Sequence, residues 1–244
     1  TTIAHSGTST FQQRQMLPEA LAARPDILIL GICLNDAEDW THPMKIQRWR
    51  DEWMTPAVSP VQAFFLRHSR TASFIASRLW ALGSSKRCVN YYRHLYDPAG
   101  AGILRLNNAI GWFHDECAAR RIAFVPVIFP LMSFDFSPGR YPMQFAHDAV
   151  HDICRRRGIT CLDLLPAFQG TSPDRMQAVP GIDPHPSEIA HRIAAETILN
   201  HLVDQRLVDE AYRFEKSDAN DFQHEVWQRT IRRIQCPPGL SATN

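Results

Sequence analysis

The sequence lacks the patterns that mark several large classes of protein. It contains no unbroken apolar stretch of about 18 residues, the length that a membrane-spanning helix needs. Its 26 basic and 25 acidic side chains give a net charge of only +1, and no long run of Lys or Arg is present. We therefore expect neither a membrane span nor a nucleic-acid partner.

Patterns for metal binding are also absent. The six cysteines are scattered and form no Cys-x-x-Cys pair, so their spacing fits neither a zinc site nor a disulfide framework. His147 and His151 have the helical spacing of a zinc-protease motif, but no Glu follows the first histidine. We interpret both as surface-helix histidines, and the sequence predicts neither a metal nor an organic cofactor.

Short apolar runs predict the strands of a parallel sheet. The runs at 26–32, 122–129 and 159–164 are typical of strands buried on both faces, although Pro126 is unusual for a central strand. A helical stretch precedes each run, and another follows the last. The four helices are expected at 11–23, 99–121, 142–157 and 187–203.

The alternation of helix and strand predicts the α/β fold class. We expect a doubly wound, flavodoxin-like parallel sheet with helices on both faces, which gives three α/β/α layers, over residues 1–203. Residues 37–98 interrupt the alternation and are rich in Trp, Phe and Tyr. We interpret them as a helical insertion or cap that includes a helix at 73–82. Its aromatic side chains either pack the cap onto the domain or line a ligand groove.

Residues 204–244 are polar and are predicted to form a helical tail. Phe222, Val226, Trp227 and Ile231 fall on one face at helical spacing. This face either docks back onto the domain or forms a homodimer contact.

One short segment carries an acid and a base. Asp183 stands two residues before His185 in a loop bounded by prolines, and Ser187 is the expected N-cap of the helix that follows. The prolines stiffen the loop and can hold a carboxylate beside an imidazole, as an orienting acid and a general base require. The alternative is a surface Asx-type turn that only starts the helix.

Two other segments carry groups that can stabilise an oxyanion. Asn35 and Asp36 follow the first apolar run, at the edge where open α/β sheets bind ligands. The Asn35 amide can donate to an oxyanion, and Asp36 can brace the loop. Gly7 lies in a turn of small residues, where its backbone N–H can approach an oxyanion closely. The alternatives are an ordinary polar loop and an ordinary turn.

Together, the three segments resemble sequence blocks of the SGNH hydrolases, also called GDSL-like lipases and esterases. Residues 6–9 resemble the block whose glycine contributes to the oxyanion hole, and residues 31–36 resemble the block whose asparagine is the other donor. Asp183 and His185 resemble the triad acid and base of that family, and the continuation to His191 fits as well. The resemblance extends over residues 1–203.

The chain departs from that family in three places. The Gly-Asp-Ser block with the nucleophilic serine is absent, two extra residues separate Gly31 from Asn35, and Asp-x-His replaces the commoner Asp-x-x-His. We expect the nucleophile, together with a strand that completes the sheet, in a segment preceding Thr1. Ser6 and Ser9 are the alternative nucleophiles.

The resemblance implies a serine ester hydrolase that needs no metal or cofactor. Its substrate would be an ester or acetyl ester, either a small molecule or a carbohydrate. Asp183 and His185 would complete the triad, and Gly7 and Asn35 would bind the oxyanion. The alternatives are an O-acyltransferase that uses the same residues on a carbohydrate and a non-catalytic SGNH-like binding domain.

Overall fold

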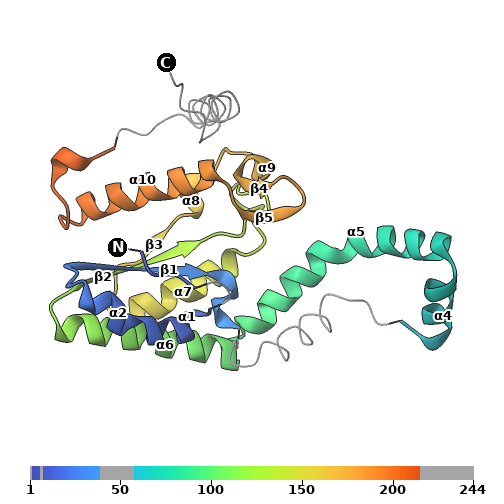
Figure 1. Ribbon diagram of the computed structural model, residues 1–244, viewed down its shortest axis with the longest axis horizontal. Helices are drawn as coiled ribbons and strands as arrows, with labels where there is room; N and C mark the ends of the chain where they lie inside the picture. The colour runs from blue at the N-terminus through green and yellow to red at the C-terminus, as the bar shows by residue number, and fades with distance from the viewer. Residues whose placement is uncertain (1, 6–7, 39–57, 215–244) are drawn as a thin grey trace, which may run out of the picture. The chain divides into compact units, whose positions relative to one another are not determined.

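The computed structural model describes residues 2–5, 8–38 and 58–214 (Figure 1). These residues form a mixed α/β structure with a three-stranded parallel sheet of order β1-β2-β3. The chain divides into two compact units. Unit 1 comprises Thr1–Ile128 and Pro142–Cys161, and unit 2 comprises Phe129–Tyr141 and Leu162–Asn244. The α/β class is confirmed, whereas the three-layer, doubly wound arrangement and the domain boundary at residue 203 stay predictions.

Two of the predicted strands are present in full. β1 is Ile27–Cys33 and β2 is Ala123–Phe129, and the N–H of Ala123 donates to the carbonyl of Asp26 at 2.9 Å, so the two strands begin side by side. Pro126 lies buried inside β2, the middle strand of the sheet, although proline is unusual in a central strand.

The expectation that β1 is buried on both faces is wrong. Leu30 and Ile32 are buried, but Ile29, which directly precedes Leu30 in the strand, is 45% exposed. Since successive side chains of a strand point to opposite faces, β1 has one buried face and one open face.

The N-terminal helix is shorter and more broken than predicted. In place of one helix at 11–23, α1 (Thr10–Gln13), a 3-10 turn η1 (Arg14–Met16) and α2 (Leu17–Ala22) follow one another. Pro18 explains the break, because it has no N–H for the preceding helix and is well suited to the first turn of a new one.

The two long helices of unit 1 lie where they were predicted. They are α6 (Ala101–Ala119) and α7 (Gln144–Arg156), and Figure 1 shows them with α1 and α2 on one side of β1 and β2. The core of unit 1 is built from their buried apolar side chains and those of the strands, which include Ile32, Val127, Ile110, Phe113, Val150 and Ile153.

His147 is not the surface residue that we expected. It is fully buried in α7, where it shares a face with the buried Val150 and Cys154 at spacings of three and seven residues. Within the described ranges, no group of three or more His, Cys, Asp and Glu side chains is placed to hold a metal ion.

The described part of the insertion at 37–98 consists of two helices after a 3-10 turn, η2 (Leu34–Ala37). They are α4 (Pro60–His68) and α5 (Arg70–Leu95), so the predicted helix at 73–82 extends in both directions. The C-terminal end of α5 packs into unit 1 through Tyr91 and Leu95, which are almost fully buried. The tryptophans of residues 39–57 lie outside the described residues.

Unit 2 contains a short β3 (Leu162–Asp163), two short helices, α8 (Leu165–Phe168) and α9 (Pro173–Met176), and a hairpin of β4 (Gln177–Val179) and β5 (Asp183–Pro186). The strand predicted at 159–164 is reduced to two residues, because the Asp163 carboxylate accepts the N–H of Leu165 at 2.8 Å and turns the chain into α8. The aromatic core of unit 2 includes Phe136, Tyr141 and Phe168.

The last long helix is α10 (Glu188–Asp204), which matches the prediction at 187–203. Ser187 is its N-cap, as expected, and its hydroxyl accepts the N–H of Ala190 at 3.2 Å. Every described helix is too short or too polar to cross a membrane.

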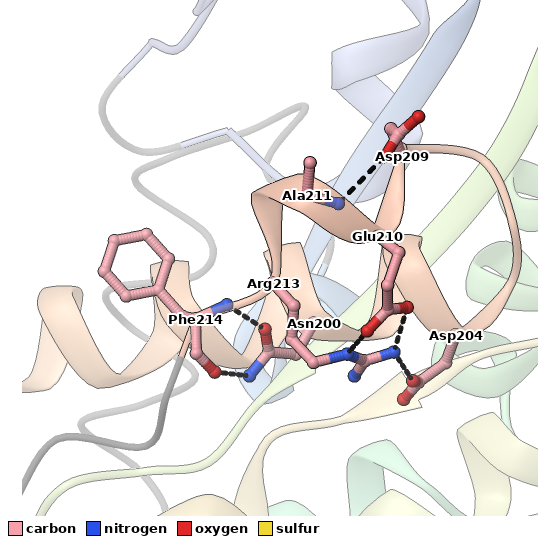
Figure 2. A network of polar contacts seen from close by, with 7 residues as sticks. All are labelled: Asn200, Asp204, Asp209, Glu210, Ala211, Arg213 and Phe214. Carbon is pink, nitrogen blue, oxygen red and sulfur yellow. Dashed lines mark hydrogen bonds and ion pairs between the residues drawn. The ribbon is translucent and has the colours of Figure 1, made fainter.

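The described start of the predicted tail folds back onto α10 (Figure 2). The Asn200 amide donates to the carbonyl of Phe214 at 3.0 Å and accepts its N–H at 2.8 Å, and Arg213 bridges Asp204 and Glu210 around the 3-10 turn η3 (Glu210–Tyr212). This segment therefore docks onto its own domain. The apolar face at 222–231 and its predicted homodimer contact lie outside the described residues.

Candidate functional site

The structure brings the predicted acid and base together on β5. The Nδ1 atom of His185 lies 2.5 Å from Oδ1 of Asp183, and the same oxygen accepts the backbone N–H of His185 at 3.1 Å. The second bond is the Asx-type turn that the sequence offered as the alternative. Both interpretations therefore describe the same carboxylate, which fixes the turn and the imidazole at once.

This arrangement determines which nitrogen of His185 can act as a base. The backbone N–H and the ring of His185 both donate to Asp183, and these bonds lower the pKa of Asp183 below its ordinary value. An ionised carboxylate only accepts hydrogen bonds, so Nδ1 carries the proton and Nε2 of the neutral ring has the lone pair. The His185 side chain is 83% exposed and that of Asp183 is 43% exposed. A substrate can therefore reach the imidazole.

The hairpin that carries the pair is held by Gln177, a residue that our sequence analysis missed. Its side chain is buried, donates to the carbonyl of Met132 at 2.9 Å and accepts the N–H of Gly181 at 2.7 Å. Gly181 has a φ of +68°, a conformation that favours glycine. This turn reverses the chain directly before Asp183.

Ser187, the nearest serine in the chain to His185, has a structural role. Its hydroxyl donates to the carbonyl of Arg175 at 2.9 Å and accepts the N–H of Ala190, so it joins α9 to the first turn of α10. Both bonds fix the end of β5, which makes Ser187 a support of the Asp183–His185 pair and not its nucleophile.

The second predicted segment forms the turn η2 at the carboxyl end of β1. Asn35 is half-buried, and its side chain makes no hydrogen bond to another described residue, which leaves its amide able to donate to a ligand. Asp36 is only 5% exposed. Its Oδ2 accepts the hydroxyl of Thr10 at 2.7 Å and the N–H of Cys33 at 3.1 Å. Asp36 thus braces the loop that carries Asn35.

Burial dominates the electrostatics of Asp36. Loss of solvation raises the pKa of this carboxyl to about 7, the bonds from Thr10 and Cys33 oppose the shift, and the nearby Glu38 adds to it. The group therefore titrates close to neutral pH, unlike an ordinary aspartate.

Three long-range contacts hold the same turn, and sequence reasoning missed all of them. Tyr91 donates to the buried Glu38, Tyr96 donates to the carbonyl of Leu34 at 2.9 Å, and Arg105 donates to the carbonyl of Ala37 at 3.2 Å. The two tyrosines belong to the aromatic-rich insertion, where they pack against the domain. No local signal could have found these partners.

The remaining predicted residues lie near the N-terminus. Gly7 and Ser6 lie outside the described residues. Ser9 is buried, and its N–H and hydroxyl both donate to the side chain of Gln12 at 3.1 and 3.3 Å. These contacts cap α1, so Ser9 does not present its hydroxyl as a nucleophile would.

Comparison with known proteins adds no relative. No protein-family model, curated protein or solved structure matches the chain.

Proposed function

We propose that this chain is a serine ester hydrolase domain of the SGNH type, in which Asp183 and His185 are the acid and base of a Ser-His-Asp triad. The observation that carries the proposal is the 2.5 Å contact between Asp183 and Nδ1 of an imidazole that is otherwise exposed. The proposal includes the three-layer, doubly wound sheet, with Asn35 at the carboxyl end of β1 as an oxyanion donor and Gly7 as the second donor.

In the proposed reaction, Nε2 of His185 takes the proton of a serine hydroxyl as its oxygen bonds to the ester carbonyl carbon. Asp183 holds the ring in the required tautomer and stabilises the imidazolium that forms. The imidazolium then returns the proton to the leaving alcohol, and the acyl group stays on the serine. Water next gives a proton to Nε2 as its oxygen attacks the acyl carbon, and His185 returns that proton to the serine oxygen, which releases the acid. The Asn35 amide stabilises the charged oxygen, and loss of such a donor typically costs about 3–4 kcal/mol in the transition state.

A fluorophosphonate probe tests the proposal, because it labels only activated serines. The protein, with any natural residues that precede Thr1 included, should be labelled at one serine that peptide mass spectrometry identifies. His185→Ala should slow labelling and p-nitrophenyl acetate hydrolysis by roughly 10⁴-fold or more.

The control is His114→Ala. The side chain of His114 is 36% exposed, and its Nδ1 lies 3.2 Å from Asp115 on α6, so it has the same type of contact outside the proposed site. It should leave labelling and hydrolysis unchanged. If neither histidine matters, or if no serine is labelled, the hydrolase proposal is wrong and a non-catalytic binding domain replaces it. If acetylated methyl glucoside accumulates in place of acetate when methyl glucoside is added, the enzyme is an acyltransferase.

A further inference from the structure

The hairpin formed by α4 and the first half of α5 (Figure 1), residues 58–79, exposes an unusual concentration of large apolar side chains. Among the described residues, fifteen large hydrophobic side chains are exposed, and seven of them lie in this hairpin. They are Val58, Val61, Phe64, Phe65, Phe74, Ile75 and Leu79. In α4, the spacing of 61, 64 and 65 gathers three of them on one helical face.

The hairpin keeps its bend through polar contacts of its own. Ser69 ends α4 by donating its N–H to the carbonyl of Phe65 at 2.9 Å, and starts α5 by accepting the N–H of Ala72 at 3.2 Å. The Ser73 hydroxyl donates to the carbonyl of Leu66 at 2.5 Å. The exposed apolar side chains are therefore not needed to fold the bend, and they are available for another surface.

The two ends of α5 differ in how far their side chains are buried. At the C-terminal end Tyr91, Tyr92 and Leu95 are buried in unit 1, whereas Phe74, Ile75 and Leu79 near the start are more than half exposed. Among the described side chains of this helix, the rest of unit 1 thus fully buries only those in the last turns. A soluble monomer rarely exposes so many large apolar side chains in one short segment unless the segment binds something.

The charge of the segment indicates what that surface binds. Residues 53–96 contain no Asp or Glu, and residues 58–96 hold six Lys and Arg side chains, which leaves 20 basic against 25 acidic side chains elsewhere in the chain. Arg67, Arg70 and Arg78 are exposed among the apolar residues, and the Arg78 guanidinium lies 5.2 Å from the ring centre of Phe74. The partner must therefore offer both negative charge and an apolar phase.

A bilayer that contains anionic phospholipids has both properties. Aromatic and aliphatic side chains can enter the boundary between headgroups and acyl chains, while arginines extend back to the phosphates. A second copy of the hairpin would bring three arginines against three, and a nucleic acid would leave the seven apolar side chains in water. We propose that the α4–α5 hairpin docks on the surface of an anionic phospholipid membrane. This inference does not depend on the proposed esterase activity.

Vesicle co-sedimentation of the full chain tests this docking. The protein should bind vesicles of phosphatidylcholine mixed with phosphatidylglycerol, bind phosphatidylcholine alone much less, and dissociate at about 1 M salt, where charges are screened within ~3 Å. Replacing Arg67, Arg70 and Arg78 together by Gln should lower the partition coefficient for the mixed vesicles about 100-fold, since each basic side chain near such a surface contributes about fivefold. The control replaces Arg120, Arg140 and Arg155, which are exposed elsewhere, and should change binding little.

A second pair of variants tests the apolar contribution. Phe64→Ser should lower binding at least tenfold, whereas Leu104→Ser on α6 should not, although the two side chains are 60% and 58% exposed. Circular dichroism should show that all variants keep the helix content of the wild type. Equal binding to both vesicle types, or unchanged binding of the Arg67, Arg70 and Arg78 variant, would overturn the proposal. So would a dimer that Phe64→Ser dissociates while no vesicle binding occurs.

Discussion

Asp36 in unit 1 and Asp183 in unit 2 hold their carboxyl groups in opposite environments. Asp36 is buried, and desolvation raises its pKa to about 7 despite hydrogen bonds from Thr10 and Cys33. Asp183 is partly exposed, and two hydrogen bonds from His185 lower its pKa. Hydrogen bonds are present in both cases, so the degree of burial decides the direction of the shift.

The two carboxyl groups are therefore suited to different roles. Asp183 is ionised at neutral pH and can orient and stabilise an imidazolium beside it. Asp36 is close to half-protonated there and, with its two donors, is better suited to holding the turn that carries Asn35. Three substitutions would break or sharpen this contrast.

The largest effect is expected from Asp183→Asn. The amide oxygen can still accept the N–H of His185, but it cannot stabilise the imidazolium, so kcat for ester hydrolysis should fall by about 10⁴-fold. The urea midpoint should hardly change, because the group is exposed. The control is Asp135→Asn, since Asp135 also accepts a backbone N–H two residues ahead, from Ser137 at 2.9 Å, and also has a lowered pKa. A variant at 183 that keeps a tenth of its activity would exclude Asp183 from the triad.

Asp36→Asn should change how stability depends on pH. The pKa of Asp36 is about 7 in the folded chain against an ordinary 3.8, so the folded state binds the proton more tightly. The contribution of Asp36 to stability is complete below about pH 4 and is lost as the pH rises to about 7. The free energy of unfolding changes by about 4 kcal/mol in total over this range. Asn removes this slope.

Urea unfolding of the wild type and Asp36→Asn across that pH range measures the difference. Asp135→Asn is again the control. Because the pKa of Asp135 is lowered, its contribution to stability is complete above about pH 3.8 and is lost only as the pH falls below that value. Parallel pH profiles for the wild type and the Asp36 variant would show that Asp36 has an ordinary pKa and is solvated.

The smallest effect is expected from Thr10→Val. This change removes the hydroxyl that donates to Asp36, so it should raise the pKa of Asp36 further and destabilise the ionised form by about 2 kcal/mol. The loss should be larger at pH values above 7 than at about pH 5, where the carboxyl is protonated. Thr197→Val on α10 removes a hydroxyl bond to the uncharged carbonyl of Ile193, and its cost should not vary with pH.

Several elements of the fold could be predicted because their signals are local. Apolar runs marked β1 and β2, and helical patterns with suitable ends marked α6, α7 and α10. The predictions that were wrong depend on hydrogen bonds and spatial neighbours, which sequence patterns do not show. A hydrogen bond at Asp163 shortened β3, and the open face of β1 and the burial of His147 depend on which neighbours cover each residue.

The two candidate segments differ in whether their contacts are local in the sequence. Asp183 and His185 are two residues apart on one strand, so the sequence alone determined that their side chains can meet. The bonds from Thr10, Tyr91 and Tyr96 to the turn at 34–38 cross 26, 53 and 62 residues of chain. Only the tertiary structure brings these groups together and removes water from Asp36, and a pKa near 7 follows from that desolvation and not from any motif.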